Sequence, residues 1–329
     1  MTPLPTLPTR RCWLLSMALA AAVPSISQAQ SYPSKPIRLI VTQAPGSGSD
    51  VVARLLADRL AEQLKQPVVV ENKPGASGLI GHQYVLSSPP DGYTLLMSST
   101  ANLLVVPVMA SKNRFRYTDF TPVAALLESH YVVVVANEPG KPATLRALLE
   151  QSRTMPLTFV SSGTGSMGHL GAELILARAG GEQRHVHVPY KGSAQALADV
   201  VGNQALFAVD TLLATEPLLK AGRLRALAVT SAQRIESLPG VPTLQEAGLP
   251  GIEISTRAGL FAPARVPVDV ATTISMAMAR VQSDPAMRST LNSLGSEPLV
   301  LTPAAYEASI AKEAPTWEAL VRRLGLRLE

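Results

Sequence analysis

Cysteine is nearly absent from this chain of 329 residues, in which Cys12 is the only one. Because Cys12 lies in an N-terminal segment that is typical of an export signal, we expect the mature chain to contain no cysteine. That absence excludes disulfides, thiolate chemistry and cysteine-ligated metals. Aromatic residues are also few, at 4%, whereas 47% of the residues are hydrophobic. This balance favours an α/β protein over a β-sandwich, and the length allows two domains.

The chain also lacks a long hydrophobic run that would predict a membrane span. The apolar segment at residues 12–23 is too short to cross a bilayer. Arg10 and Arg11 precede this segment and a small-x-small sequence ending at Ala29 follows it, so residues 1–29 are predicted to be an export signal peptide cleaved near Ala29. The paired arginines leave twin-arginine export and the general secretory route both open. We therefore expect a soluble periplasmic protein.

A large excess of charge of one sign is missing too. The formal net charge is +5, and removal of Arg10 and Arg11 with the signal leaves +3 (5 − 2) on the mature chain. This value is too small to predict a nucleic-acid partner. The sequence contains no G-x-S-x-G nucleophile elbow and no motif that pairs a nucleophile with a base, so we expect no catalytic residues and no enzyme activity.

A strand, a glycine-serine loop and a helix follow one another near the start of the mature chain. Alternating apolar residues predict a strand at 35–41, and apolar residues at every fourth position predict a helix at 51–64. The loop between them contains Gly46-Ser-Gly-Ser49. A helix start carries unpaired backbone N–H groups and a partial positive charge, and small residues let an anion approach these groups. The loop is therefore a predicted site for a carboxylate or a phosphate.

Similar units recur along the chain and predict parallel sheets. Further strands are expected at 67–71, 93–97, 131–136, 157–160, 185–188, 205–209, 224–229 and 255–261, and helices at 79–86, 144–151, 169–179, 194–201, 268–282, 285–294 and 303–324. A second loop of small residues, 161–168, again precedes a helix. Because parallel sheets bind ligands beyond the carboxyl ends of their strands, we expect the two loops to face each other across a cleft that closes by hinge motion.

Eight short motifs occur in the order that is typical of one family of receptors. They lie at residues 32–38, 44–46, 66–72, 90–96, 188–193, 220–222, 225–231 and 241–248. The chain resembles the substrate-binding proteins of tripartite tricarboxylate transporters, the Bug or TctC-type periplasmic solute receptors. The resemblance implies a two-lobed type II periplasmic-binding-protein fold, or Venus flytrap, in which each lobe is a mainly parallel sheet flanked by helices. Residues 30–130 and 256–329 would form lobe 1, and residues 131–255 lobe 2.

The resemblance also implies the ligand, the partners and the site. The ligand would be a small organic acid held through its carboxylate without a cofactor or a metal, and the partners would be the membrane subunits of the transporter, with a monomeric receptor. The residues carried over by position are Ser47, Gly48, Ser49, Asp50, Ser162, Thr164, Gly165, Ser166, His169 and Asp210, with Ser77 and Ser99 on two further strand-end loops. Gln43 replaces an aromatic residue found in many relatives, and it favours a polar distal end of the ligand.

Other interpretations of the same residues stay open at this point. Ser49 and Asp50 are also typical helix caps. The pattern Gly163-Thr-Gly-Ser-Met-Gly168 matches a dinucleotide-binding loop, but no acidic residue follows the next strand to hold a ribose, which disfavours an NAD(P)-dependent oxidoreductase. His185 and His187 alternate on one strand without neighbouring carboxylates, which favours packed histidines over a metal site. The receptor could also signal to a sensor protein instead of delivering its ligand to a transporter.

Overall fold

The computed structural model describes residues 32–111, 115–180, 184–293 and 295–328, so the predicted signal peptide at 1–29 lies outside the described residues. The strands form one sheet in the order β2-β1-β3-β9-β4-β7-β5-β6, and β8 and β10 also pair with β4. These strands are β1 (Ile37–Val41), β2 (Val68–Asn72), β3 (Thr94–Ser99), β4 (Phe120–Ala136), β5 (Thr158–Ser161), β6 (Val186–Pro189), β7 (Phe207–Thr211), β8 (Leu224–Val229), β9 (Ser255–Pro263) and β10 (Ser296–Pro298).

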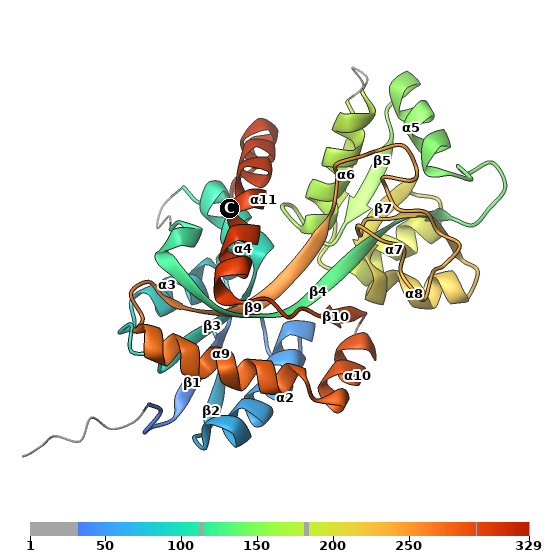
Figure 1. Cartoon of the computed structure of the whole chain (residues 1–329). Coiled ribbons are helices and arrows are strands. Elements are labelled where there is room, and N and C mark those ends of the chain that lie inside the picture. The colour runs from blue at the N-terminus through green and yellow to red at the C-terminus, as the bar shows by residue number, and fades with distance from the viewer. Residues whose placement is uncertain (1–31, 112–114, 181–183, 294, 329) are drawn as a thin grey trace, which may run out of the picture.

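Two parallel groups of strands are joined by two long antiparallel strands. In the first group β1 pairs with β2 and β3, and in the second β5 pairs with β6 and β7. Figure 1 shows β4 and β9 running side by side from one half of the molecule towards the other. Residues 120–130 of β4 pair with β9, whereas residues 131–136 pair with β7 and β8. This change of partner lies where the sequence predicts the first crossing between lobes, and the exact lobe boundaries stay a prediction.

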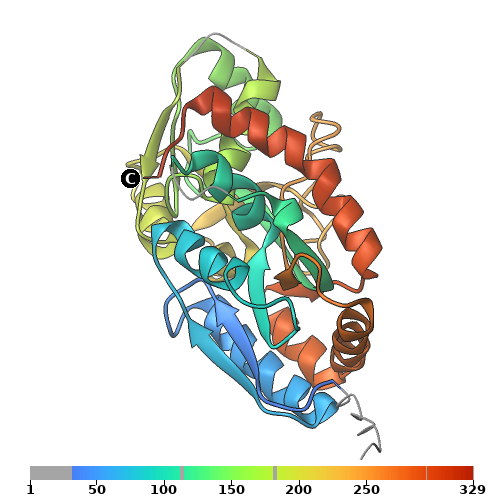
Figure 2. The same ribbon diagram turned by 90° about the vertical axis from the view of Figure 1, so that its left-hand side faces the viewer.

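Ten α-helices and two 3₁₀ turns lie within the described ranges. They are α2 (Gly48–Leu64), η1 (Ala76–Gly78), α3 (Leu79–Leu86), α4 (Thr100–Met109), η2 (Tyr117–Asp119), α5 (Leu145–Thr154), α6 (Met167–Ala179), α7 (Ser193–Val201), α8 (Leu212–Lys220), α9 (Val268–Gln282), α10 (Pro285–Ser293) and α11 (Pro303–Leu324). Helices α2 and α9 pack against each other, α2 also against β1 and β2, and α9 against β4. Helix α11 packs along α4 and against β4, as Figure 2 shows.

The pattern of apolar residues explains this packing. Leu56 and Leu60 recur on one face of α2, and Ile37 and Leu39 point from β1 towards them; all four side chains are fully buried in one cluster. Burying a side chain of this kind stabilises the fold by roughly 1.5 to 3 kcal/mol. The apolar positions from which the strand and the helix were predicted therefore also determine which faces of the two elements pack together.

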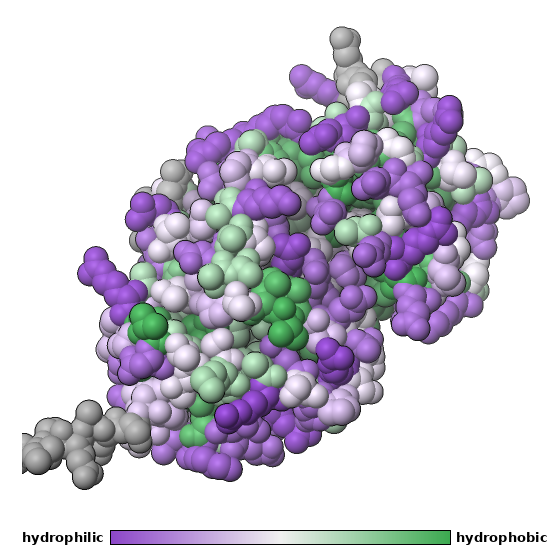
Figure 3. Space-filling view, viewed as in Figure 1, coloured by the Kyte–Doolittle hydropathy of each residue, from purple (hydrophilic) through white to green (hydrophobic). Residues whose placement is uncertain are grey.

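Polar side chains cover most of the face shown in Figure 3, with apolar side chains in scattered groups. Among the described residues, no helix combines the length and the apolar composition that a membrane span needs. Charged residues also tie the long strands to α11. Arg257 of β9 pairs with Glu128 of β4, with 3.1 Å between Nε and Oε1, and with Glu313 of α11. These pairs hold the C-terminal helix against the strands that connect the two halves.

Candidate functional site

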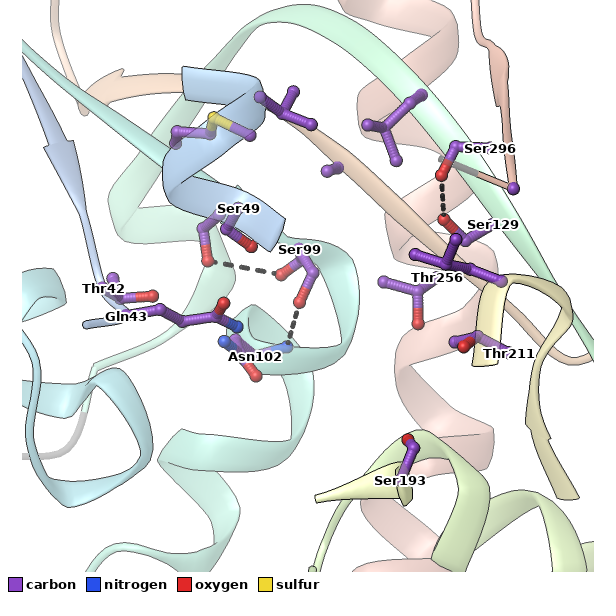
Figure 4. A pocket seen from close by; sticks show the side chains of 17 residues that line it. Thr42, Gln43, Ser49, Ser99, Asn102, Ser129, Ser193, Thr211, Thr256 and Ser296 are labelled. Carbon is purple, nitrogen blue, oxygen red and sulfur yellow. Dashed lines mark hydrogen bonds between the residues drawn. The ribbon is translucent and has the colours of Figure 1, made fainter. Parts of the chain in front are cut away.

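A cavity of about 460 Å³ lies between the carboxyl ends of β1, β3 and β7 and the adjoining parts of β4, β9 and β10. Its wall is mostly hydroxyl and amide side chains, and none of its lining residues, all from the described ranges, is charged. Figure 4 shows the side chains of the 17 lining residues. They are Thr42, Gln43, Ser49, Val52, Met97, Ser98, Ser99, Asn102, Leu127, Ser129, Ser193, Thr211, Leu213, Thr256, Ala258, Gly295 and Ser296.

Four helices begin at the wall of this cavity. Ser49 belongs to the first turn of α2, Ser99 caps α4, Ser193 is the first residue of α7, and Thr211 caps α8. The first backbone N–H groups of a helix have no partner within the helix, and aligned peptide dipoles give its start a partial positive charge. Four such starts around one uncharged cavity form a site that favours an anion.

The capping hydroxyls leave their own protons available for a further partner. Ser99 Oγ accepts a hydrogen bond from the Asn102 amide at 3.2 Å, and Thr211 Oγ1 accepts one from the Ala214 amide at 3.3 Å. A hydroxyl that accepts in this way can still donate its proton. Both hydroxyls can therefore donate to an oxygen atom of a bound carboxylate, beside the helix N–H groups.

The predicted first loop is only partly in the cavity. Gln43 and Ser49 line it, whereas Ser47 and Asp50 do not, and Gly48 is the first residue of α2. Ser47 caps α2, and its Oγ accepts from the Asp50 amide at 3.3 Å. The carboxylate of Asp50 is 3% exposed and accepts from the Arg54 guanidinium at 3.0 Å, the Gly46 amide at 2.9 Å and the Asn72 amide group at 2.9 Å. These bonds, chiefly the one from Arg54, lower the pKa of Asp50 to about 2, so Asp50 holds the loop and the helix start together.

The predicted second loop lies at the start of α6, and none of its predicted site residues lines this cavity. Those residues are Ser162, Thr164, Gly165, Ser166 and His169. Ser166 caps α6 by accepting from the His169 amide at 3.2 Å, and Nδ1 of His169 accepts from the Gly165 amide at 3.0 Å. A Cβ placed on Gly165 would lie 2.7 Å from Sδ of Met109, so the loop packs against the far end of α4. The structure therefore does not bring the two loops together around the cavity.

Two histidines stack beside this second loop. The rings of His169 and His187 lie 3.7 Å apart between centroids and are nearly parallel, and His187 Nε2 lies 2.8 Å from Ser161 Oγ. Burial lowers the pKa of both histidines to about 4. They are packed, neutral side chains at neutral pH. Among the described residues, no group of three or more His, Cys, Asp or Glu side chains could hold a metal ion.

The three remaining predicted residues have different surroundings. Ser99 lines the cavity, whereas Ser77 is exposed in η1 with a φ of 54°. Asp210 is 3% exposed and lies directly behind the wall. Its Oδ1 accepts from Ser193 Oγ at 2.8 Å and from the Thr211 amide at 2.7 Å, and burial raises its pKa. Asp210 thus contacts two lining residues without lining the cavity itself.

Several lining residues were not predicted from the sequence. Ser129 and Thr256 come from β4 and β9, Ser296 from β10, and Ser193 and Thr211 from the starts of α7 and α8. Ser129 and Ser296 are hydrogen-bonded to each other at 2.7 Å although 167 positions separate them. A cap signal could have indicated Thr211, because it stands directly before two leucines that open a helix. The serines on the strands carry no comparable signal.

Comparisons with known proteins agree on one family. Residues 52–326 match the family model described as tripartite tricarboxylate transporter family receptor. BugT of Bordetella pertussis is 32% identical over 326 residues, which cover 98% of this chain and 99% of BugT.

Solved structures give the same result. Rpa4515 of R. palustris with adipate is 31% identical with a TM-score of 0.74, and the match covers 90% of this chain and 99% of that one. MatC of Rhodopseudomonas palustris with bound malate is 28% identical with a TM-score of 0.72, and the match covers 88% of this chain and 100% of that one. The predicted α/β fold of a periplasmic binding protein is thereby confirmed.

Proposed function

The chain belongs to the tripartite tricarboxylate transporter receptor family, and on this basis we propose that it is a periplasmic receptor for a small organic acid. It binds the acid through a carboxylate and delivers it, as a monomer without a cofactor, to the membrane subunits of a tripartite tricarboxylate-type transporter. The similarity to structures that hold adipate and malate supports an organic-acid ligand. Membership of this receptor family favours solute binding over the oxidoreductase that the pattern at residues 163–168 left open.

The observation that carries the proposal is the convergence of four helix starts on one uncharged cavity. Backbone N–H groups and the hydroxyls of Ser99 and Thr211 supply hydrogen-bond donors for a carboxylate. A dissociation constant near 1 μM requires only about 8 kcal/mol. Helix starts and hydroxyls can supply this without a guanidinium, and such moderate binding suits a receptor that has to release its ligand.

A single substitution at a helix cap tests the proposal. In Ser99→Asp the new carboxylate keeps the capping function, because Asp is as good a cap as Ser, but it places a negative charge at the cavity. Two like charges about 4 Å apart repel by about 4 kcal/mol at an effective dielectric constant of 20, so we expect the dissociation constant for adipate or malate to rise at least about a hundredfold. Isothermal titration calorimetry measures this change, after a screen of mono-, di- and tricarboxylates has identified the best ligand.

Two further cap variants serve as comparison. Thr144→Asp makes the same change at the cap of α5, away from the cavity, and should leave the affinity as in the parent protein. Ser166→Asp places the charge at the cap of α6, where the sequence predicts the second loop of the site. If Ser166→Asp abolishes binding and Ser99→Asp does not, the site lies at the second loop. If neither variant weakens binding, the ligand is not held as an anion at either helix start.

A further inference from the structure

Ser193 lines the cavity, and its hydroxyl proton is already used in a hydrogen bond to a carboxyl group behind the wall. Ser193 Oγ donates to Oδ1 of Asp210 at 2.8 Å. The same Oδ1 accepts from the Thr211 amide at 2.7 Å, so this oxygen acts as an acceptor whether or not the carboxyl group carries a proton on Oδ2. Ser193 must therefore be the donor of the pair. A serine hydroxyl has one proton and two acceptor positions, so Ser193 can offer only an acceptor to a ligand.

This property distinguishes Ser193 from the two capping hydroxyls of the cavity. Ser99 Oγ and Thr211 Oγ1 accept from backbone amides and keep their protons for a ligand. Ser193 Oγ and the Thr211 amide both lie within 2.8 Å of Asp210 Oδ1, so they are immediate neighbours. A carboxylate bound at the start of α8 would thus have donors in front of it and a hydrogen-bond acceptor beside it. A carboxylate oxygen facing Ser193 would meet only lone pairs, whereas a ligand hydroxyl would complete a hydrogen bond.

We propose that Ser193, oriented by Asp210, selects organic acids that carry a hydroxyl group next to a carboxylate. The inference rests on the proposed function, since it assumes that a carboxylate occupies the cavity. A ligand hydroxyl fits better than an ammonium group, because four helix starts with partial positive charge surround the cavity and none of the lining side chains, within the described ranges, is acidic. The ligand class is therefore 2-hydroxycarboxylates, and Asp210 is a positioning residue that acts through Ser193.

Matched pairs of acids that differ only by the hydroxyl group test this inference. The pairs are malate and succinate, lactate and propionate, and citrate and tricarballylate, with aspartate as the amino analogue of malate. The hydroxy acid of a binding pair should bind about 2- to 13-fold more tightly than its partner, which corresponds to the contribution of about 0.5 to 1.5 kcal/mol that such a hydrogen bond makes. Isothermal titration calorimetry of the mature protein gives these ratios.

Substitutions at Ser193 test whether this residue causes the affinity ratio between the hydroxy acid and its partner without the hydroxyl group. Ser193→Ala should bring the ratio to about 1 by weakening the hydroxy acid alone, and Ser193→Thr, which keeps a hydroxyl, should restore the preference. Ser129→Ala is the matched control, because it removes a cavity hydroxyl that pairs with Ser296 instead of a carboxylate. Even if Ser129→Ala binds both acids of a pair more weakly, the ratio of its two affinities should equal that of the parent protein. Circular dichroism checks that each variant is folded.

The possible outcomes separate this inference from the function on which it rests. Equal or tighter binding of the deoxy acids by the parent protein, or an unchanged ratio in Ser193→Ala, would overturn the role of Ser193 while leaving the carboxylate receptor in place. Tighter binding of aspartate than of malate would replace the hydroxyl by an ammonium group and overturn the proposed ligand class. Binding of none of these acids would overturn the proposed function, and the inference with it.

Discussion

Gly295 brings the turn before β10 against the start of α8, and we predict that a methyl group there weakens ligand binding. Both Gly295 and Leu213 line the cavity, so the contact joins two walls of the site. A Cβ placed on Gly295 would lie 2.8 Å from the backbone nitrogen and the Cβ of Leu213 and 2.9 Å from its Cα. The new methyl group points at Leu213, and backbone atoms cannot turn aside as the end of a side chain can. In Gly295→Ala the two walls must therefore move apart.

The size of the effect follows from this overlap. To reach an ordinary contact near 3.4 Å, the walls must separate by about 0.6 Å, and overpacking of this kind costs about 1 to 3 kcal/mol. If the walls touch in the ligand-bound state and separate in the ligand-free state, the dissociation constant of the best carboxylate should rise by about 5- to 150-fold. Calorimetric titration measures the affinity, and urea denaturation measures the free energy of unfolding without ligand.

A second glycine supplies the control. Gly325, which follows α11, has a φ of 63°, close to the 65° of Gly295, but a Cβ added there would meet no atom within 4 Å. Gly325→Ala therefore carries the left-handed backbone strain, about 1 to 2 kcal/mol of unfolding free energy, and no clash. It should lower stability and leave affinity unchanged. Equal affinities of Gly295→Ala and Gly325→Ala would refute the idea that this contact belongs to the ligand-bound state.

Two further predictions concern pH and stability. Burial lowers the pKa of His82 from 6.5 to about 4, so between these pH values the unfolded chain binds a proton at this position that the folded chain does not. His82 alone should therefore lower the free energy of unfolding by about 3 kcal/mol as the pH drops from 6.5 to 4, in addition to the losses from His169 and His187. Urea denaturation of His82→Gln should show a loss smaller than that of the parent protein by about this amount. Asp50 acts in a lower pH window, because Arg54 lowers its pKa from 3.8 to about 2: its contribution to stability is complete above pH 3.8 and is lost as the pH falls to 2. Asp50→Asn should lower the melting temperature at pH 7 and flatten the pH dependence below pH 4, whereas Asp58→Asn, at an exposed position of the same helix, should match the parent protein.

Much of the fold could be predicted, because the apolar positions that repeat along the sequence are the ones that the structure buries. Helix α11 has the predicted bounds, and the other predicted helices and strands lie where expected, with ends that shift by a few residues except at β4, which begins at Phe120 and not at residue 131. Helix α4 was missed for a physical reason. It packs between α11 and the sheet, so its side chains are apolar on several sides and show no amphipathic period. Pro107 also lies inside this helix, where proline is unfavourable because it has no backbone N–H to donate.

The site was less accessible to sequence analysis. Gln43, Ser49 and Ser99 could be predicted, because they follow predicted parallel strands and the ends of such strands meet at one edge of a sheet. The opposite wall depends on how distant segments meet. Ser129 was missed because only residues 131–136 of β4 were predicted as a strand, and no local signal relates Ser129 to Ser296.

The uncharged wall of the cavity has a consequence for the medium in which the protein works. Attraction between full charges is screened by dissolved salt over about 8 Å at physiological ionic strength, so a receptor that captured its ligand with arginine side chains would bind less readily as salt rises. Here none of the described lining residues carries a charge. The partial charges at the helix starts are screened by salt as well, but they are smaller than full charges. The affinity should therefore fall less with rising salt than that of a receptor that relies on arginine side chains.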